Sequence, residues 1–438
     1  MRTLNHKNIA IGLGLTFAVT LLGLPVVAGH ESEATLGGPI SGLTAEELAL
    51  FEEGKALFEK DFTPKEGLGP IYNGRSCVKC HVHPGTGGSE NGTAENVTHF
   101  GVVHDGRFLS SFEIGGPVQQ RLSIAGDPEA PDCQMPAENA IAHQAANPLI
   151  TRSIRHTPPV FGFGLIDGIA DADIVANERA ERRFSSVKGF TNWAVEMEII
   201  GAFTGLGIDF TRTQPFGASR VGRFGWKSQT ATLHMFSADP FNIELGMSNP
   251  WFKRENTPDL NPVPPECDVA TNKVNDPDGQ MSLRLFYFQA LVAPPPRARI
   301  TGKVARGERV FDEIGCTDCH RKSYRTVDDY YMPWPDGTAH RVEALSGKTF
   351  HPFSDFLVHD MGPELADGRV MGRAAGNFWR TTPLWGARFK TRFLHDGSAT
   401  SMGEAIMRHG GEGAASRNAY AALPPGKKKL LHAFLDSL

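Results

Sequence analysis

Two five-residue segments of the chain carry its strongest chemical signal. Residues 77–81 read Cys-Val-Lys-Cys-His, and residues 316–320 read Cys-Thr-Asp-Cys-His. Two thiols three positions apart and followed directly by a histidine are the attachment pattern of c-type haem, in which the histidine binds the iron. The alternative, one zinc site with four sulfur ligands, would leave both histidines unexplained. The sequence therefore predicts two covalent haems, with the attachment residues Cys77, Cys80, Cys316 and Cys319 and the iron ligands His81 and His320.

The N-terminus resembles an export signal. Arg2 and Lys7 precede an apolar run that ends in small residues at positions 26–28. This order is typical of a signal peptide, and it predicts cleavage near Ala28 and a periplasmic protein without a membrane span in its mature form. A retained membrane anchor is the alternative, because the run is about long enough to cross a bilayer.

The two remaining cysteines are Cys133 and Cys267, out of six in the chain. Cysteines of exported proteins usually pair. An even remainder of two therefore favours a disulfide between them, with two buried free thiols as the alternative.

The charge is mildly acidic. Loss of Arg2 and Lys7 with the signal peptide would change the formal net charge from −5 to −7. Such a charge can attract a cationic redox partner and argues against nucleic-acid binding.

A weak internal repeat accompanies the two haem motifs. Helix-like segments at residues 46–60 and 304–315 precede the motifs, and each places Gly and Phe four positions apart, at Gly54/Phe58 and Gly307/Phe311. We expect a mainly α-helical protein of two cytochrome c-type domains, residues 29–293 and 294–438, joined at a proline-rich linker. The first domain is enlarged by long loop-rich insertions.

Residues 224–250 and 379–411 resemble the bacterial di-haem cytochrome c peroxidase superfamily. The segments "GRFGWKSQ", "FSDFLVHDMGPELADG" and "FLHDGSA" are most similar to its di-haem oxidoreductase branch, whose members are labelled thiol oxidoreductases or peroxidases. In the peroxidases, the distal methionine of the C-terminal haem follows a Phe-His-Asp/Ser-Gly element by fourteen residues. Fourteen residues after His395 stands His409. The resemblance therefore implies His409 as the second ligand of that iron, with a solvated histidine before a Gly-Gly turn as the alternative, and places His359 and His395 at haem edges.

The resemblance also implies two residues for the N-terminal haem. Trp226 matches a tryptophan between the haems, and Glu244 matches a distal carboxylate once a two-residue gap is allowed. Phe236 stands where the peroxidases have a glutamine. A surface position for Glu244 is the alternative. Loop histidines His99 and His104 are candidates for a ligand that caps this iron at rest, or are ordinary loop residues.

A carboxylate beside an open iron could take a proton from the inner oxygen of peroxide and return it to the leaving oxygen. The resemblance thus implies reduction of hydrogen peroxide at the N-terminal haem, with electrons relayed through the C-terminal haem from a small soluble donor such as a cytochrome c or a cupredoxin. Two alternatives stay open: an oxidase or oxygenase that uses dioxygen on an organic or protein substrate, and a non-catalytic electron-transfer protein. The sequence also leaves open whether calcium is bound.

Overall fold

The computed structural model describes residues 36–94, 96–104, 107–110, 118–138, 150–184, 186–195, 208–209, 214–215, 219–255, 257, 262–272 and 274–438. The predicted signal peptide, residues 1–28, lies outside them. The described residues belong to one compact unit. Within them, no helix combines the length and the apolar character needed to cross a membrane.

Helices form most of the packing framework of the described chain. The α-helices are α1 (Ala45–Glu59), α3 (Phe163–Asp167), α4 (Asp171–Phe184), α6 (Leu233–Ile243), α7 (Gln280–Leu291), α8 (Gly302–Glu313), α9 (Met402–Met407), α10 (Ala414–Ala422) and α11 (Pro425–Leu435). Short 3₁₀ turns are η1 (Pro64–Glu66), η2 (Cys77–Lys79), η5 (Cys316–Asp318), η6 (Glu343–Leu345), η7 (Pro363–Leu365), η8 (Ala387–Phe389) and η9 (Gly411–Gly413).

The strands are mostly short and pair antiparallel. In the three-stranded sheet, β2 (Val97–His104) lies between β3 (Arg107–Ser110) and β5 (Ile150–Arg155). The two-stranded pairs are β1 (Ile71–Tyr72) with β4 (Leu122–Ser123), β6 (Trp193–Val195) with β9 (Ser219–Val221), β7 (Ile208–Asp209) with β8 (Gln214–Pro215), β10 (Tyr324–Arg325) with β13 (Thr349–Phe350), β11 (Tyr331–Pro333) with β12 (Ala339–Arg341), and β14 (Val358–Asp360) with β15 (Phe378–Arg380).

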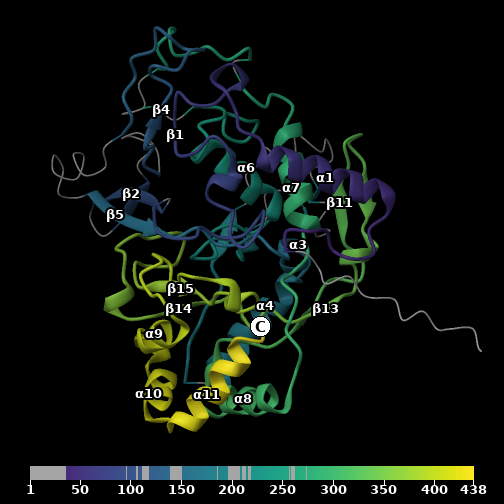
Figure 1. The fold of residues 1–438 in the computed structure, drawn as a ribbon, viewed down its shortest axis with the longest axis vertical. Coiled ribbons are helices and arrows are strands. Elements are labelled where there is room, and N and C mark those ends of the chain that lie inside the picture. The colour runs from purple at the N-terminus through teal and green to yellow at the C-terminus, as the bar shows by residue number, and fades with distance from the viewer. Residues whose placement is uncertain are drawn as a thin grey trace, which may run out of the picture. The chain divides into compact units, whose positions relative to one another are not determined.

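The first haem motif follows a helix that crosses another helix closely. Helix α1 begins at a capping box, in which Thr44 and Glu47 bond each other's backbone N–H groups. It packs against α7 (Figure 1), and a side chain at Gly54 would collide with the α7 backbone. One turn later Phe58 contacts both Phe288 of α7, at 4.7 Å between ring centroids, and His81, at 5.7 Å.

The second haem motif has the same arrangement. Helix α8 packs against α11 (Figure 1), and a side chain at Gly307 would collide with the α11 backbone. Phe311 contacts Phe434 of α11, at 5.2 Å, and His320, at 6.2 Å. The internal repeat in the sequence thus corresponds to two similar helix pairs, each of which ends in a 3₁₀ turn that carries the cysteines.

The core consists mainly of two apolar clusters. The larger one joins α1, α3, α6 and α7 and also contains residues of the C-terminal segment, among them Tyr324, Phe350 and Trp385. A smaller cluster joins α8, α10 and α11. Helices are therefore the main regular structure of the described chain, although long loops and short strands make up much of it. The division into two cytochrome c-type domains stays a prediction.

Candidate active site

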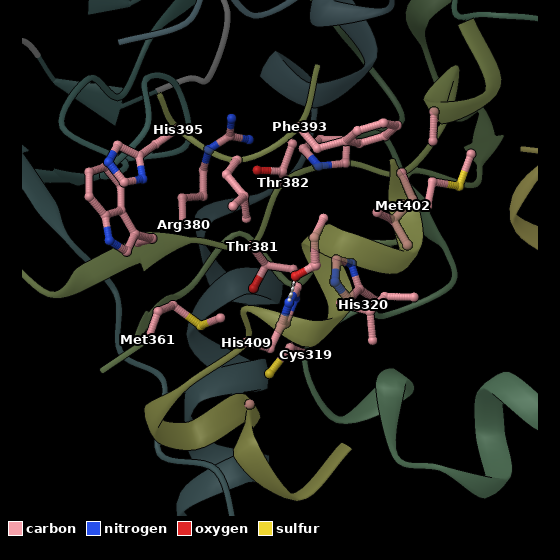
Figure 2. A pocket seen from close by; sticks show the side chains of 18 of the residues that line it. Cys319, His320, Met361, Arg380, Thr381, Thr382, Phe393, His395, Met402 and His409 are labelled. Atoms are coloured by element: carbon pink, nitrogen blue, oxygen red, sulfur yellow. Dashed lines mark hydrogen bonds between the residues drawn. The ribbon is translucent and has the colours of Figure 1, made fainter. Parts of the chain in front are cut away.

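The second haem motif opens onto a cavity of about 230 Å³. Cys316, Cys319, His320 and His409 all line it. Figure 2 shows the imidazoles of His320 and His409 directed into this cavity, close to Cys319. His320 follows η5, whereas His409 follows the short helix α9, so residues about ninety positions apart face the same space.

Backbone carbonyl groups orient both histidines. The Nδ1 atom of His320 lies 2.8 Å from the carbonyl oxygen of Phe353, and that of His409 lies 2.8 Å from the carbonyl oxygen of Ala405. A carbonyl oxygen accepts from a protonated Nδ1 and so leaves Nε2 as the metal-binding nitrogen. Burial lowers the pKa of His320 to about 4 and also lowers that of His409, which keeps both rings neutral, as iron binding requires.

The lining of this cavity fits a haem. Apolar side chains such as Phe311, Phe393 and Met402 supply most of it, and Arg380 and Lys390 add positive charge. Burial lowers the pKa of Arg380 to about 10, and burial together with the charge of Arg380 lowers the pKa of Lys390 to about 8. Buried cations require anionic partners. The two propionates of a haem would supply them.

The first haem motif opens onto a second cavity, of about 170 Å³, lined by Cys77, Cys80 and His81. The Nδ1 atom of His81 lies 3.1 Å from the carbonyl oxygen of Gly88, which again leaves Nε2 for a metal. Burial lowers the pKa of His81 to about 4. The donor set at this cavity therefore also fits a haem iron.

Glu244 lines this N-terminal cavity rather than the protein surface. It is the C-cap residue of α6, and its Oε2 accepts a hydrogen bond of 2.9 Å from the Nδ2 of buried Asn73. Asn73 in turn accepts from the backbone N–H of Arg121 at 3.0 Å. Burial raises the pKa of Glu244 to about 8, against the opposing effect of the Asn73 hydrogen bond. A carboxyl group in this range can take up and release protons near neutral pH.

Trp226 lines both cavities. Its indole Nε1 donates a hydrogen bond of 3.0 Å to the carbonyl oxygen of His156, another residue that lines both. Trp226 therefore lies between the two candidate haem sites.

A buried ionic network lies beside Trp226. The Asp367 carboxylate contacts the guanidinium of Arg155 at 2.5 Å and the Nζ of Lys227 at 3.0 Å. Both cations also lie over the ring of Trp379, at 4.5 and 4.2 Å from its centroid. Lys227 further donates to backbone carbonyl oxygens at residues 369, 375 and 376. The network thus fastens the loop 366–376 to the segment that carries Trp226.

The other histidines that the sequence singled out are divided between the two cavities, except His104. His395 lines the C-terminal cavity and stacks on Trp379 at 3.7 Å. His359 lines it too, and its Nδ1 lies 3.7 Å from the sulfur of Cys319. His99 lines the N-terminal cavity, where its buried Nδ1 has no hydrogen-bond partner among the described residues. The side chain of His104 lies outside the described residues.

The structure adds residues that the sequence did not single out. Asp239 and Gln229 line the N-terminal cavity beside Glu244, as does Phe236 from the position of the expected glutamine. Asp239 could have been found as a charge on an otherwise apolar helix face, whereas Gln229 comes from a loop and gives no such signal. The disulfide predicted from the sequence is confirmed: Cys133 and Cys267 are bonded to each other across 134 positions of sequence.

The model of a family described as "di-haem oxidoreductase, putative peroxidase" matches residues 137–438. The chain belongs to this di-haem oxidoreductase family. The match contains the second haem motif, Trp226, Glu244 and His409, whereas the first haem motif precedes it. As a member of this family, the protein is an oxidoreductase with two haems.

Among curated proteins, no sequence matches this di-haem oxidoreductase. The solved structures that are similar to it include the following two, both at low identity. Hydrazine synthase from Kuenenia stuttgartiensis is 12% identical, with a TM-score of 0.36, and the match covers 98% of this chain and 100% of that one. A MauG-like protein associated with microbial copper homeostasis is 15% identical, also with a TM-score of 0.36, and the match covers 91% and 92% of the two chains.

Proposed function

We propose that this di-haem oxidoreductase reduces hydrogen peroxide at its N-terminal haem, in the periplasm, with electrons that enter through the C-terminal haem. The observation that carries the proposal is the difference between the two cavities. Two oriented histidines face the C-terminal cavity, whereas the N-terminal cavity combines the motif histidine His81 with the carboxyl group of Glu244. A pure electron carrier has no use for a buried acid beside its iron.

In this proposal both haems are covalent, through Cys77/Cys80 and Cys316/Cys319, and His81, His320 and His409 bind iron. When bound, the haem at His81 would supply an iron centre that binds peroxide and accepts electrons. Two neutral imidazoles at the C-terminal cavity suit an electron-transfer iron, because six-coordinate haem offers no open position to a substrate. Trp226, which lines both cavities, would lie on the route between them.

Glu244 has the proton chemistry that peroxide reduction requires. The reaction breaks one O–O bond, consumes two electrons and two protons, and forms two waters. The Glu244 carboxylate would take the proton from one peroxide oxygen and give it to the other, which then leaves as water. The Asn73 amide holds the Oε2 of Glu244 in place for this transfer. A one-electron donor, such as a small cytochrome c or cupredoxin, would act twice in each turnover.

The test is Glu244→Gln, which keeps the volume and the hydrogen bond from Asn73 but cannot carry a proton. Peroxide-dependent oxidation of the donor should fall by about 10²–10⁴-fold, the usual contribution of general acid–base catalysis. In the wild type the rate should rise with pH through about 8, as the carboxylate forms, and the variant should lose this rise. Stopped-flow absorbance of the reduced protein measures both the rate of the peroxide reaction and its dependence on pH.

Glu343→Gln is the matched control, because the Glu343 side chain is 70% exposed. Its peroxide rate should equal that of the wild type. A wild-type protein that fails to oxidise donor with peroxide contradicts the proposed reaction. A Glu244→Gln variant with the wild-type rate and pH profile contradicts the role of Glu244 alone.

A further inference from the structure

One face of helix α6 covers the N-terminal cavity. Phe236, Asp239, Pro240, Ile243 and Glu244 line the cavity, and their spacing of three and four positions places them on one side of the helix. Ser237 and Phe241 of α6 line the cavity as well; apart from the two acids, Ser237 is the one polar residue among them, and its hydroxyl donates a hydrogen bond to the carbonyl oxygen of Leu233. A charged residue on this face costs free energy unless it has a role or a partner. Besides Glu244, Asp239 is such a residue.

The surroundings of Asp239 do not neutralise it. No described group donates a hydrogen bond to its carboxylate, and the cation that acts on it is Arg369, from the loop 366–376. Arg155 lines the same cavity but contacts Asp367, and His99 faces the cavity as a neutral ring whose pKa burial lowers. Glu244 is close enough to Asp239 for the charge of Asp239 to raise its pKa. Asp239 is thus a carboxyl group aimed at a cavity rather than a member of a closed ion pair.

Burial raises the pKa of Asp239 to about 6, against the opposing charge of Arg369. Burial raises that of Glu244 further, to about 8. The cavity therefore holds two carboxyl groups that load and release protons at different pH values. At neutral pH Asp239 is therefore mainly a carboxylate, and as the stronger acid of the two it gives up readily any proton that it takes from the solvent, which is the property of a proton relay.

We infer that Asp239 is a second proton-transferring residue of the N-terminal cavity and delivers protons to the oxygen atoms on which Glu244 acts. The inference rests on the proposed function. Glu244 only moves a proton that peroxide already carries, so two further protons must reach the oxygen atoms before both leave as water. The Asp239 carboxylate takes each of the two protons in turn from the bulk solvent and passes it to an oxygen atom, returning to its ionised form each time, while the two electrons come from the one-electron donor.

Asp239→Asn replaces the titratable carboxyl group by an amide that cannot transfer the proton, and it keeps the size of the side chain. Cyanide is the probe: hydrogen cyanide loses its proton to a cavity base as the anion binds ferric iron, so its binding rate reports on the carboxyl groups without any peroxide turnover. In the wild type this rate should change with pH near 6 and again near 8. The Asp239→Asn variant should lose the inflection near pH 6, and the Glu244→Gln variant should lose the inflection near pH 8. Infrared spectroscopy should show one carboxylic C=O band fewer in Asp239→Asn at pH 5.

Peroxide turnover of Asp239→Asn should fall by about 10²-fold at neutral pH. Asp239→Glu should keep the lower inflection, which separates loss of the carboxyl group from misfolding. Asp328→Asn is the matched control, because the Asp328 side chain is 82% exposed, and it should change nothing. If Asp239→Asn retains both inflections and the wild-type infrared bands, the inference is wrong. If the wild type does not turn over peroxide but Asp239→Asn loses the inflection near pH 6, the proposed reaction fails and the proton-transferring role stands.

Discussion

Asp367 offers a stringent test of the buried network beside Trp226. Its side chain is 3% exposed and contacts the guanidinium of Arg155 at 2.5 Å and the Nζ of Lys227 at 3.0 Å. It also accepts a hydrogen bond of 2.6 Å from the hydroxyl of Ser153 and one of 3.0 Å from the backbone N–H of Arg369. Asp367→Asn keeps the shape of the side chain and removes its charge, so two buried cations lose their shared counter-charge.

The expected cost is about 3–5 kcal/mol of the free energy of unfolding, the usual consequence of leaving a buried charge without its partner. Burial alone would raise the pKa of Asp367, but the charges of Arg155 and Lys227 outweigh burial and lower it. A carboxylate whose pKa is lowered by folding stabilises the protein above its unfolded pKa of about 3.9 and loses this effect as the pH falls through its folded pKa. The difference between wild type and Asp367→Asn should therefore be full at pH 7 and shrink below about pH 4.

Urea unfolding of the haem-loaded protein, followed by far-UV circular dichroism, measures this difference. Asp328→Asn is the control: Asp328 pairs with Arg325 at 2.8 Å, but its side chain is 82% exposed. An exposed pair of this kind contributes about 0–1 kcal/mol. If Asp367→Asn costs no more than this control at pH 7, the network does not stabilise the fold as argued.

Two further variants test the disulfide and the C-terminal iron. Replacing Cys133 and Cys267 by serine should lower the free energy of unfolding by about 4–5 kcal/mol in urea experiments, since the disulfide closes a loop of 134 positions, and a loss below about 1 kcal/mol would contradict the chain-entropy argument. His409→Ala should open the C-terminal iron and give a high-spin signal in electron paramagnetic resonance while His320 stays bound. An unchanged low-spin spectrum would exclude His409 as a ligand.

The haem motifs could be identified from the sequence because their chemistry is local. Two cysteines and a histidine within five residues, at 77–81 and again at 316–320, are sufficient to indicate the cofactor without knowledge of the fold. The spacing of Gly54 and Phe58, repeated at Gly307 and Phe311, likewise reflects a local helical period. In the structure these glycines are the points where α1 meets α7 and α8 meets α11.

The resemblance to the di-haem cytochrome c peroxidase superfamily predicted further site residues, but only at positions that match the motifs of that superfamily. It drew attention to Trp226, Glu244 and His409, all of which line the two cavities. Asp239 was not singled out, because neither a local motif nor the resemblance gave it a role. Its charge on a mostly apolar segment is a signal in the sequence, but only the structure shows that Asp239 and Glu244 line the same cavity.

The sequence by itself predicted two haems, an export signal and a helix before each haem motif. Only the tertiary structure decided which distant side chains meet. Arg155, Lys227 and Asp367 are separated by up to 212 positions, and each alone would be read as an ordinary surface charge. They lie together because a buried charge costs free energy unless an opposite charge or hydrogen bonds within the protein replace the lost water. Such partners are fixed by chain packing over the whole domain, which no local pattern of residues encodes.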